Sequence, residues 1–193
     1  MIEYPLPLLG ISAYSGTGKT TLLRRLLPIL RDKGLRIAVI KHAHHLFEID
    51  HPAKDSYELR KAGAVEMLVA SRRRMALVTE FEDDHPEPTL REMLSSINHE
   101  KLDLVLVEGF KREDFPKIEL HRPSLGKPLL SASDSHIIAI ATDQPLAETP
   151  RNLPQLNLND ADEIVAFIQG YMHQFRENRP PEPPQNAHSP QLC

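Results

Sequence analysis

The sequence Ser15-Gly16-Thr17-Gly18-Lys19-Thr20-Thr21 lies between an apolar run at residues 6–13 and a leucine pattern that begins at Thr21. The apolar run predicts a buried strand, and the leucines at helical spacing predict a helix over residues 21–30. A glycine-rich turn between a strand and a helix exposes backbone N–H groups at the positive end of the helix dipole, where anions bind. These residues in this order predict a P-loop, a turn that holds phosphate groups.

The residues of this loop offer different groups to a polyphosphate. Lys19 reaches the β- and γ-phosphates as a point charge, and Thr20 offers its hydroxyl to Mg²⁺. The pattern G-x-x-x-x-G-K-[ST] has glycine where this chain has Ala13, a departure that is tolerated if φ at this position is negative. The predicted phosphate-binding residues are Ser15, Gly16, Thr17, Gly18, Lys19, Thr20 and Thr21.

The composition is that of a soluble protein with one main domain. The chain has 193 residues, 40% of them hydrophobic, and no stretch approaches the ~20 apolar residues that cross a bilayer. The net charge of −4 gives no electrostatic argument for binding nucleic acid. The acidic start is unlike a signal peptide, and the single cysteine, Cys193, excludes an intrachain disulfide. We therefore expect a cytoplasmic protein that binds neither nucleic acid nor membrane.

Apolar strand patterns alternate with helical patterns along the chain, which is typical of an α/β fold with a mostly parallel sheet flanked by helices. Residues 65–70 and 75–79 predict two strands joined by a short turn, and so an additional β-hairpin. We expect one P-loop NTPase domain over residues 1–175 and a proline-rich, disordered tail over residues 176–193. Further strands are predicted at residues 35–40, 102–107, 118–120 and 137–141, and further helices at residues 56–61, 89–97 and 160–171.

Several residues predict where the helices begin and end. Pro28 is expected to kink the first helix or to end its regular part, and Gly34 is expected to close that helix in a left-handed conformation. Asp160 is expected to cap the last helix. Asp55 has two interpretations, as a helix cap before Ser56 or as a functional carboxylate.

A second acidic group is needed near the phosphates to hold Mg²⁺, and Glu108 is the candidate. It ends the apolar run L-D-L-V-L-V, and ligands of parallel sheets bind at the carboxyl ends of the strands. Gly109 next to it would let the backbone approach a γ-phosphate. Asp103, at the start of the same strand, is expected at the opposite edge of the sheet with a structural role.

The loop after the second predicted strand opens at the same edge of the sheet. Lys41, His42, His44 and His45 are candidates for contacts with an anion or a partner, and imidazole groups also suit zinc, nickel or copper. Their spacing matches no familiar metal-binding pattern, so anion or partner contact is the preferred interpretation. Farther along, Asp50 and Asp55 are further candidates for the Mg²⁺ side of the site.

Two other groups of residues carry more than one interpretation. Arg72, Arg73 and Arg74 are candidates for forked contacts with an anionic ligand or a partner, or form a solvated turn that faces the acidic residues from Glu80 onward. Asp143 follows the strand I-I-A-I-A, where an aspartate can accept hydrogen bonds from N1 and N2 of guanine. One aspartate without the full Asn-Lys-x-Asp signature does not decide between GTP and ATP.

Four segments together resemble one family. The segments are G-I-S-A-Y-S-G-T-G-K-T-T-L, I-K-H-A-H-H, D-x-x-x-K-D-S-Y-E-L-R-K-A-G-A and L-V-L-V-E-G-F-K, and the chain is similar in them to the molybdopterin-guanine dinucleotide biosynthesis protein B (MobB) family. The resemblance covers about residues 6–172. The P-loop alone is shared by many families, whereas the histidine and K-D-S-Y-E-L-R segments are far more specific.

The resemblance implies a GTP-binding, weakly GTP-hydrolysing protein, usually a homodimer, with GTP and Mg²⁺ as its cofactors. It implies an adaptor for the MobA-type guanylyltransferase that attaches GMP to molybdopterin. By position it implies the Mg²⁺-side role for Glu108 and phosphate binding for Gly16, Gly18, Lys19, Thr20 and Thr21.

Two other functions fit the same loop. A metal-insertion GTPase would use His42, His44 and His45 to carry an ion, and an ATP-dependent ligase resembling dethiobiotin synthetase would use Lys41 and Asp55 on a carboxylated substrate. Since no catalytic base or arginine finger is evident, we expect slow hydrolysis, which Arg60 or an arginine of residues 72–74 would accelerate across a dimer.

Overall fold

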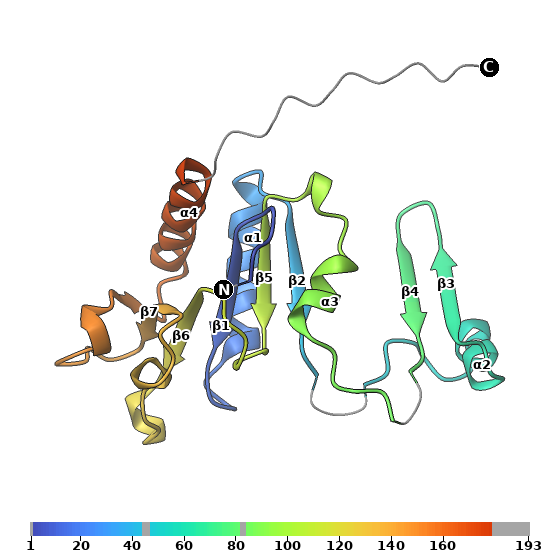
Figure 1. The fold of residues 1–193 in the computed structure, drawn as a ribbon, viewed down its shortest axis with the longest axis horizontal. Helices are drawn as coiled ribbons and strands as arrows, with labels where there is room; N and C mark the ends of the chain where they lie inside the picture. The colour runs from blue at the N-terminus through green and yellow to red at the C-terminus, as the bar shows by residue number, and fades with distance from the viewer. Residues whose placement is uncertain (1, 44–46, 82–83, 179–193) are drawn as a thin grey trace, which may run out of the picture. The chain divides into compact units, whose positions relative to one another are not determined.

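The computed structural model describes residues 2–43, 47–81 and 84–178. The chain forms two compact units, one made of Met1–His42 with Leu94–Cys193 and the other of Ala43–Met93. Figure 1 shows the order of the elements along the chain. The smaller unit interrupts the larger one, since the chain leaves the larger unit after its second strand and returns before its next strand.

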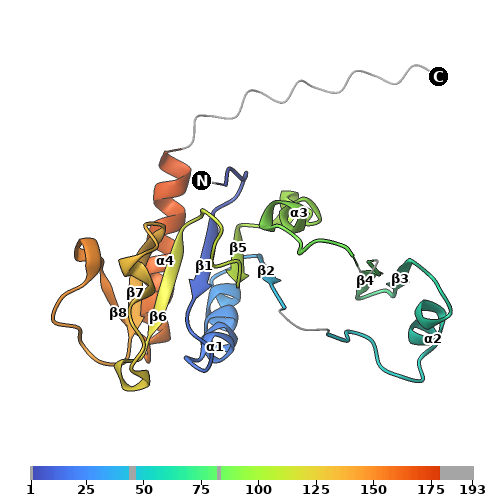
Figure 2. The same ribbon diagram turned by 60° about the horizontal axis from the view of Figure 1, so that its bottom comes forward.

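The larger unit is built on a six-stranded parallel sheet, which confirms the predicted α/β fold. The strand order is β2-β5-β1-β6-β7-β8, and Figure 2 shows the strands side by side in this order. Strand β8 is absent from the sequence prediction because its three residues are too short for a readable apolar pattern. The strands are β1 (Leu8–Ser12), β2 (Ile37–Lys41), β5 (Leu104–Glu108), β6 (Lys117–His121), β7 (Ile137–Thr142) and β8 (Gln155–Asn157).

Helices α1 (Lys19–Asp32) and α4 (Ala161–Glu177) pack against each other and share one hydrophobic core with the sheet. Leucines at helical spacing cover the inner face of α1, as the sequence predicts. Complete burial of a leucine side chain stabilises the fold by roughly 1.5–3 kcal/mol. The buried residues of the two helices are Leu22, Leu23, Leu26, Leu30, Ala161, Ile164, Val165, Ile168 and Met172.

Helix α1 does not end at Pro28 but continues to Asp32. Pro28 and Arg24, whose carbonyl loses its helical partner, both lie on the exposed side of the helix, where water can hydrate that carbonyl. The predicted closure at Gly34 is confirmed. Gly34 has φ 82°, its N–H donates to Arg31 O (2.8 Å), and the Leu35 N–H donates to Leu30 O (3.2 Å), which is a Schellman motif.

Helix α4 begins as predicted, because the Asp160 carboxylate accepts from the N–H groups of Asp162 and Glu163. It continues to Glu177, past the predicted end near Tyr171 and past the boundary predicted at residue 176. The apolar spacing continues through Met172, which is buried in the core and holds the last turns against the sheet. The remainder of the predicted tail, residues 179–193, lies outside the described residues.

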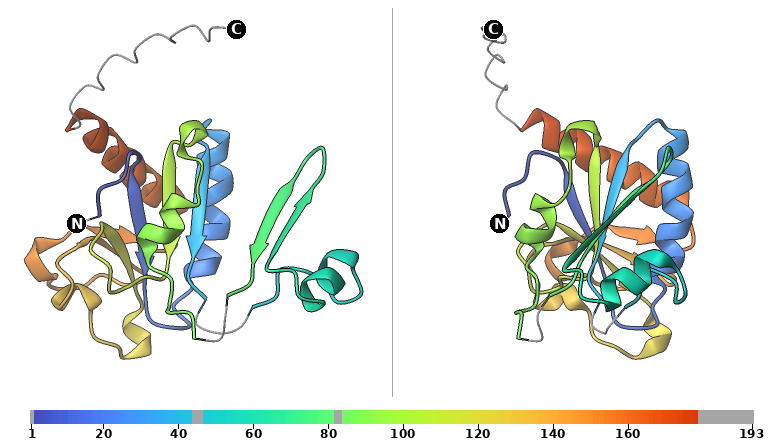
Figure 3. Two further views of the ribbon diagram at one scale, coloured as in Figure 1. Left: turned by 45° about the vertical axis from the view of Figure 1, so that its right-hand side comes forward. Right: turned by 90° about the vertical axis from the view of Figure 1, so that its right-hand side faces the viewer.

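The smaller unit contains the predicted hairpin, shown with α2 in Figure 3. Strands β3 (Glu66–Ala70) and β4 (Met75–Thr79) are antiparallel, with Leu68 opposite Leu77, and helix α2 (Asp55–Lys61) packs beside β3. The interpretation of Asp55 as the helix cap is wrong, because the cap residue is Lys54 and Asp55 is the first helical residue.

Helix α3 (Leu90–Ser95) is shorter than the predicted residues 89–97. Thr89 lies just before it and forms a capping box with Glu92 that sets its start. Four short 3₁₀ turns complete the described structure: His99–Lys101, Pro123–Leu125, Leu130–Ala132 and Pro150–Asn152.

Candidate functional site

The loop between β1 and α1 has the backbone that a P-loop requires. Gly16 and Gly18 have φ of 81° and 108°, a region that glycine enters without strain. Gly18 is the N-cap of α1, so the first amides of that helix are free to face a ligand. Thr17 is buried and its hydroxyl donates to Tyr14 O at 2.9 Å, so its side chain holds the loop in shape.

Ala13, the departure from the P-loop pattern, is accommodated by the fold. It is buried in the hydrophobic core, and it is not among the described residues with positive φ. The condition under which alanine replaces the first glycine is therefore met. Ser15, Gly16, Thr20 and Thr21 are exposed, so four of the predicted phosphate-binding residues are accessible.

The Lys19 side chain folds back over the loop. Its Nζ donates to the carbonyl oxygens of Ala13 and Tyr14, both at 3.3 Å. Burial lowers the pKa of Lys19, the positive charge of Lys111 lowers it further, and the negative charge of Glu108 opposes this shift. An ammonium group that is partly desolvated and held by neutral carbonyls would gain from an anionic partner in the loop.

Glu108 lies beside Thr20, as the Mg²⁺ prediction requires. Strand β5 pairs with β1 and β2, so that Glu108 is in register with Ile11 on one side and Lys41 on the other. The Thr20 hydroxyl donates to Glu108 Oε1 at 3.4 Å. A hydroxyl and a carboxylate at the end of a parallel sheet fit the preference of Mg²⁺ for oxygen ligands. Asp103, at the other end of β5, accepts from the Arg36 N–H at 2.8 Å, in line with its predicted structural role.

The chain after Glu108 packs tightly against His42. Gly109 has φ 106°, and a Cβ placed on it would lie 2.6 Å from His42 Cβ, so no larger residue fits there. The imidazole ring of His42 stacks on Phe110 with a centroid distance of 4.5 Å, and the His42 N–H donates to Glu108 O. These contacts hold the β2 and β5 ends together.

The structure describes only part of the histidine loop. His44 and His45 lie outside the described residues. Within residues 2–43, 47–81 and 84–178, no three His, Cys, Asp or Glu side chains gather in a group that could hold a metal ion. A transition-metal role for the histidine loop therefore stays a hypothesis.

Asp143, the predicted base-binding residue, lies directly after β7 and forms an ion pair with Arg122. Arg122 follows β6, and its Nε also donates to Thr17 O in the phosphate loop at 3.0 Å. Sequence reasoning missed Arg122, because the motif H-R-P gives no local signal for a contact with a loop more than a hundred residues away.

Lys111 is a second residue that sequence reasoning missed. Its Nζ lies 5.8 Å from the ring centroid of Tyr14, within the range of a cation–π contact. It lies three residues after Glu108, which ends the buried strand β5, and ligands bind at such strand ends. This position is the sequence signal that could have identified Lys111. Lys111 adds a second positive charge beside the phosphate loop.

The remaining predicted residues belong to the smaller unit. Arg60 is buried there, with a side chain 5% exposed, and it forms ion pairs with Glu48 and Glu80; its role across a dimer stays a prediction. The hydrogen bond of Arg60 lowers the pKa of Glu48, and Ser56 is the main cause of a lowered pKa of Asp50. The Mg²⁺ role of Asp55 stays a prediction.

Arg72, Arg73 and Arg74 are exposed in the hairpin turn, where the Ser71 N–H donates to Arg74 O at 2.7 Å. The interpretation that this turn faces the acidic stretch is wrong for Glu80. The Glu80 N–H bonds to Val65 O, at the opposite end of the hairpin.

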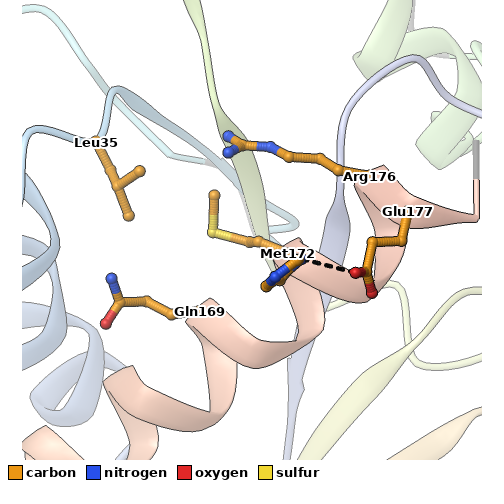
Figure 4. Close-up of a pocket in the computed structure, with 6 residues that line it drawn as sticks. Leu35, Gln169, Met172, Arg176 and Glu177 are labelled. Carbon is orange, nitrogen blue, oxygen red and sulfur yellow. Dashed lines mark ion pairs between the residues drawn. The ribbon is translucent and has the colours of Figure 1, made fainter. Parts of the chain in front are cut away.

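A hollow of about 590 Å³ lies between Leu35 and the last turns of α4 (Figure 4). Met172 and Gln169 line it together with His173 and Glu177, whose Nδ1 and Oε1 atoms are 3.7 Å apart. Leu35 precedes β2, so this hollow lies at the amino end of that strand. The candidate site is at the carboxyl ends, where Lys19, Thr20, Glu108 and Asp143 lie.

Comparison with known proteins assigns the chain to a family. The family model "MobB: Molybdopterin guanine dinucleotide synthesis protein B" matches residues 8–143. A molybdopterin-guanine dinucleotide biosynthesis adapter protein of Escherichia coli is 46% identical over 168 residues, which are 86% of this chain and 94% of that protein. Its counterpart in Haemophilus influenzae is 42% identical over 90% of this chain and 94% of that protein.

Solved structures agree with this assignment. A crystal structure of molybdopterin-guanine biosynthesis protein B has a TM-score of 0.64 and 25% identity, covering 84% of this chain and 98% of that chain. A MobB homolog from Bacillus stearothermophilus has a TM-score of 0.63 and 26% identity, covering 86% and 98%. The sequence matches and the shared P-loop fold show that the chain belongs to the MobB family.

Proposed function

We propose that this protein binds GTP with Mg²⁺ at the carboxyl ends of β1 and β5. The observation that carries the proposal is the joint position of Lys19, Thr20 and Glu108 beside a glycine loop that caps α1. Lys19 supplies charge to the β- and γ-phosphates, while Thr20 and Glu108 supply oxygen ligands for the ion. Lys41, in register with Glu108, adds a further cation near the same phosphates.

Guanine is the proposed base. Asp143 Oδ1 is buried and accepts no hydrogen bond from any residue that the structure describes. A buried carboxylate oxygen without a donor is costly, and the N1–H and N2–H groups of guanine are suitable donors. Adenine offers an acceptor at N1, which an ionised carboxylate does not bind.

The proposed role is that of an adaptor rather than a fast GTPase. The cations near the loop support phosphate binding, and Arg60 is buried in ion pairs with Glu48 and Glu80. Without a positioned base or arginine finger, hydrolysis is expected to be slow. The relatives are named as adapter proteins of molybdopterin-guanine dinucleotide biosynthesis, so we propose a MobA-type guanylyltransferase as the partner.

A homodimer is proposed from the face of the hairpin. Leu68, Leu77 and Met75 lie on one face and are 57%, 57% and 71% exposed. An exposed stripe of large apolar side chains is typical of an interaction surface. Among the described residues, no helix is long and apolar enough to span a bilayer. The cytoplasm is the proposed location.

Isothermal titration with GTP and Mg²⁺ tests the nucleotide site. Lys19→Ala is expected to weaken GTP binding roughly tenfold to a hundredfold, the usual effect of losing a charged hydrogen bond. Chelation of Mg²⁺ with EDTA is expected to weaken binding in the unmodified protein. Lys101→Ala, in the 3₁₀ turn before β5, is the matched control and is expected to bind like the unmodified protein. Absence of GTP binding, or binding unchanged by Lys19→Ala, would contradict the proposal.

A further inference from the structure

Arg122 connects the carboxyl ends of three neighbouring strands. It follows β6 directly, Asp143 follows β7, and the phosphate loop follows β1, and these strands are adjacent in the order β1-β6-β7. Its Nε donates to Thr17 O at 3.0 Å, and its Nη1 donates to Asp143 Oδ2. A Cβ placed on Gly18 would lie 4.0 Å from Nη2. One guanidinium group thus touches the base-side carboxylate and the phosphate loop together.

The two contacts orient their partners. The bond to Nη1 takes Asp143 Oδ2 and leaves the buried Oδ1 as the oxygen without a donor among the described residues. The bond to Thr17 O restrains the residue before Gly18, whose left-handed conformation starts α1. A planar guanidinium with fixed donors transmits orientation better than a flexible ammonium group does.

We propose that Arg122 is a positioning residue that couples recognition of the base at Asp143 to binding of the phosphates. It acts through Asp143 and Thr17, to which its Nη1 and Nε groups donate hydrogen bonds. The inference rests on the proposed GTP site. As a consequence of this coupling, the base increases the affinity for the nucleotide only when Arg122 holds Asp143 and the P-loop in their relative positions.

The test compares GTP with inorganic tripolyphosphate, which offers the phosphates without a base. Isothermal titration of each ligand in the presence of Mg²⁺ gives the ratio of the GTP affinity to the tripolyphosphate affinity. Arg122→Gln is expected to lower this ratio about tenfold, because the loss of a charged hydrogen bond reduces affinity by about that factor. In Asp143→Asn the ratio is expected to be low already, and adding Arg122→Gln is expected to change it little further.

Arg151→Gln is the matched control. Arg151 also donates to backbone carbonyls, those of Ser131, Asp134 and Ile137, but at the amino end of β7. A purely structural arginine changes stability and leaves the affinity ratio unchanged, which is the result expected for this variant. If Arg122→Gln does not fold, Arg122→Lys keeps a charge but not the fork and is expected to lower the ratio partially.

Three outcomes are informative. Equal losses of GTP and tripolyphosphate affinity in Arg122→Gln, or in Arg122→Lys where that variant is used, would make Arg122 a phosphate ligand or a structural residue and overturn the inference. A lowered ratio of GTP affinity to tripolyphosphate affinity in Arg122→Gln, together with an unchanged ratio in Arg151→Gln, would support the inference. If the unmodified protein binds tripolyphosphate but prefers no base, or binds neither ligand, the proposed GTP site fails before the coupling is at issue.

Discussion

At the scale of single residues, the buried charges of the larger unit show how the fold tolerates polar groups in its core. Lys117 on β6 has a side chain 1% exposed, and its Nζ donates to Asp134 Oδ2 at 2.9 Å. Burial by itself would raise the pKa of Asp134, but the hydrogen bonds from Lys117 and from the His136 N–H outweigh it and lower the pKa. Asp134 is thus ionised at neutral pH and gives the buried Lys117 side chain a partner of opposite charge.

Asp134→Asn is expected to lower the free energy of unfolding by about 3 kcal/mol at pH 7, since it leaves Lys117 buried without a counter-ion. Because the folded pKa of Asp134 is lowered, this stabilisation is complete above the ordinary aspartate pKa and is lost as the pH falls through the lowered value. Urea unfolding at pH 7 and in strong acid measures both effects.

Asp114→Asn is the control for this experiment. Asp114 is exposed and lies 3.5 Å from His136, so its replacement is expected to cost less than about 1 kcal/mol. A cost for Asp134→Asn that is the same at all pH values would contradict the role of its charge.

At the scale of helices and strands, α1 and α4 have glycines with different roles, one just after the C-terminal end of a helix and one inside a helix. The Gly34 closure of α1 uses a left-handed residue, whereas Gly170 lies inside α4 with open space around its α-carbon. The same substitution at these two positions has opposite consequences, since only one of them needs the freedom of glycine.

Gly34→Ala is expected to lower the free energy of unfolding by roughly 1–2 kcal/mol, the cost of a left-handed conformation for a residue with a Cβ. Gly170→Ala is expected to raise it by about 0.5–1 kcal/mol, because alanine favours the helix and restricts the unfolded chain. Thermal unfolding of both variants measures the pair. A loss of stability in Gly170→Ala would show that this helical position is not as open as it appears in the fold.

At the scale of the whole molecule, one face of the hairpin in the smaller unit exposes large apolar side chains. Leu68 and Leu77 are opposite each other in the antiparallel register, with Met75 next on the same face. Exposed apolar strands associate readily with another chain, and the arginines of the turn add charge at one end of this face.

Leu68→Glu is expected to convert the proposed homodimer into a monomer, because it places a charge in the centre of the apolar stripe. Light scattering after size-exclusion chromatography measures the mass. Leu59→Glu, at an exposed position of α2, is the matched control and is expected to leave the mass unchanged. A monomeric unmodified protein, or a dimer that tolerates Leu68→Glu, would contradict this assignment of the interface.

The local sequence was sufficient to predict the P-loop, the parallel strands, the hairpin, the closure at Gly34 and the cap at Asp160. These features depend on residues close together in the chain, where apolar period, glycine conformation and capping act directly. Solvent and packing decide other features: α1 continues past Pro28, where the unpaired carbonyl faces water, and α4 extends beyond its predicted end because Met172 is packed in the core.

The site divides in the same way. Lys19 and Thr20 were predicted because the loop motif contains them, and Glu108 was predicted because it ends a buried strand. The bridge from Asp143 through Arg122 to Thr17 joins residues more than a hundred positions apart, and no local pattern encodes it. Only the packing of β1, β6 and β7 side by side brings these strand ends within hydrogen-bond distance, so the tertiary fold alone connects the proposed base-binding residue with the P-loop.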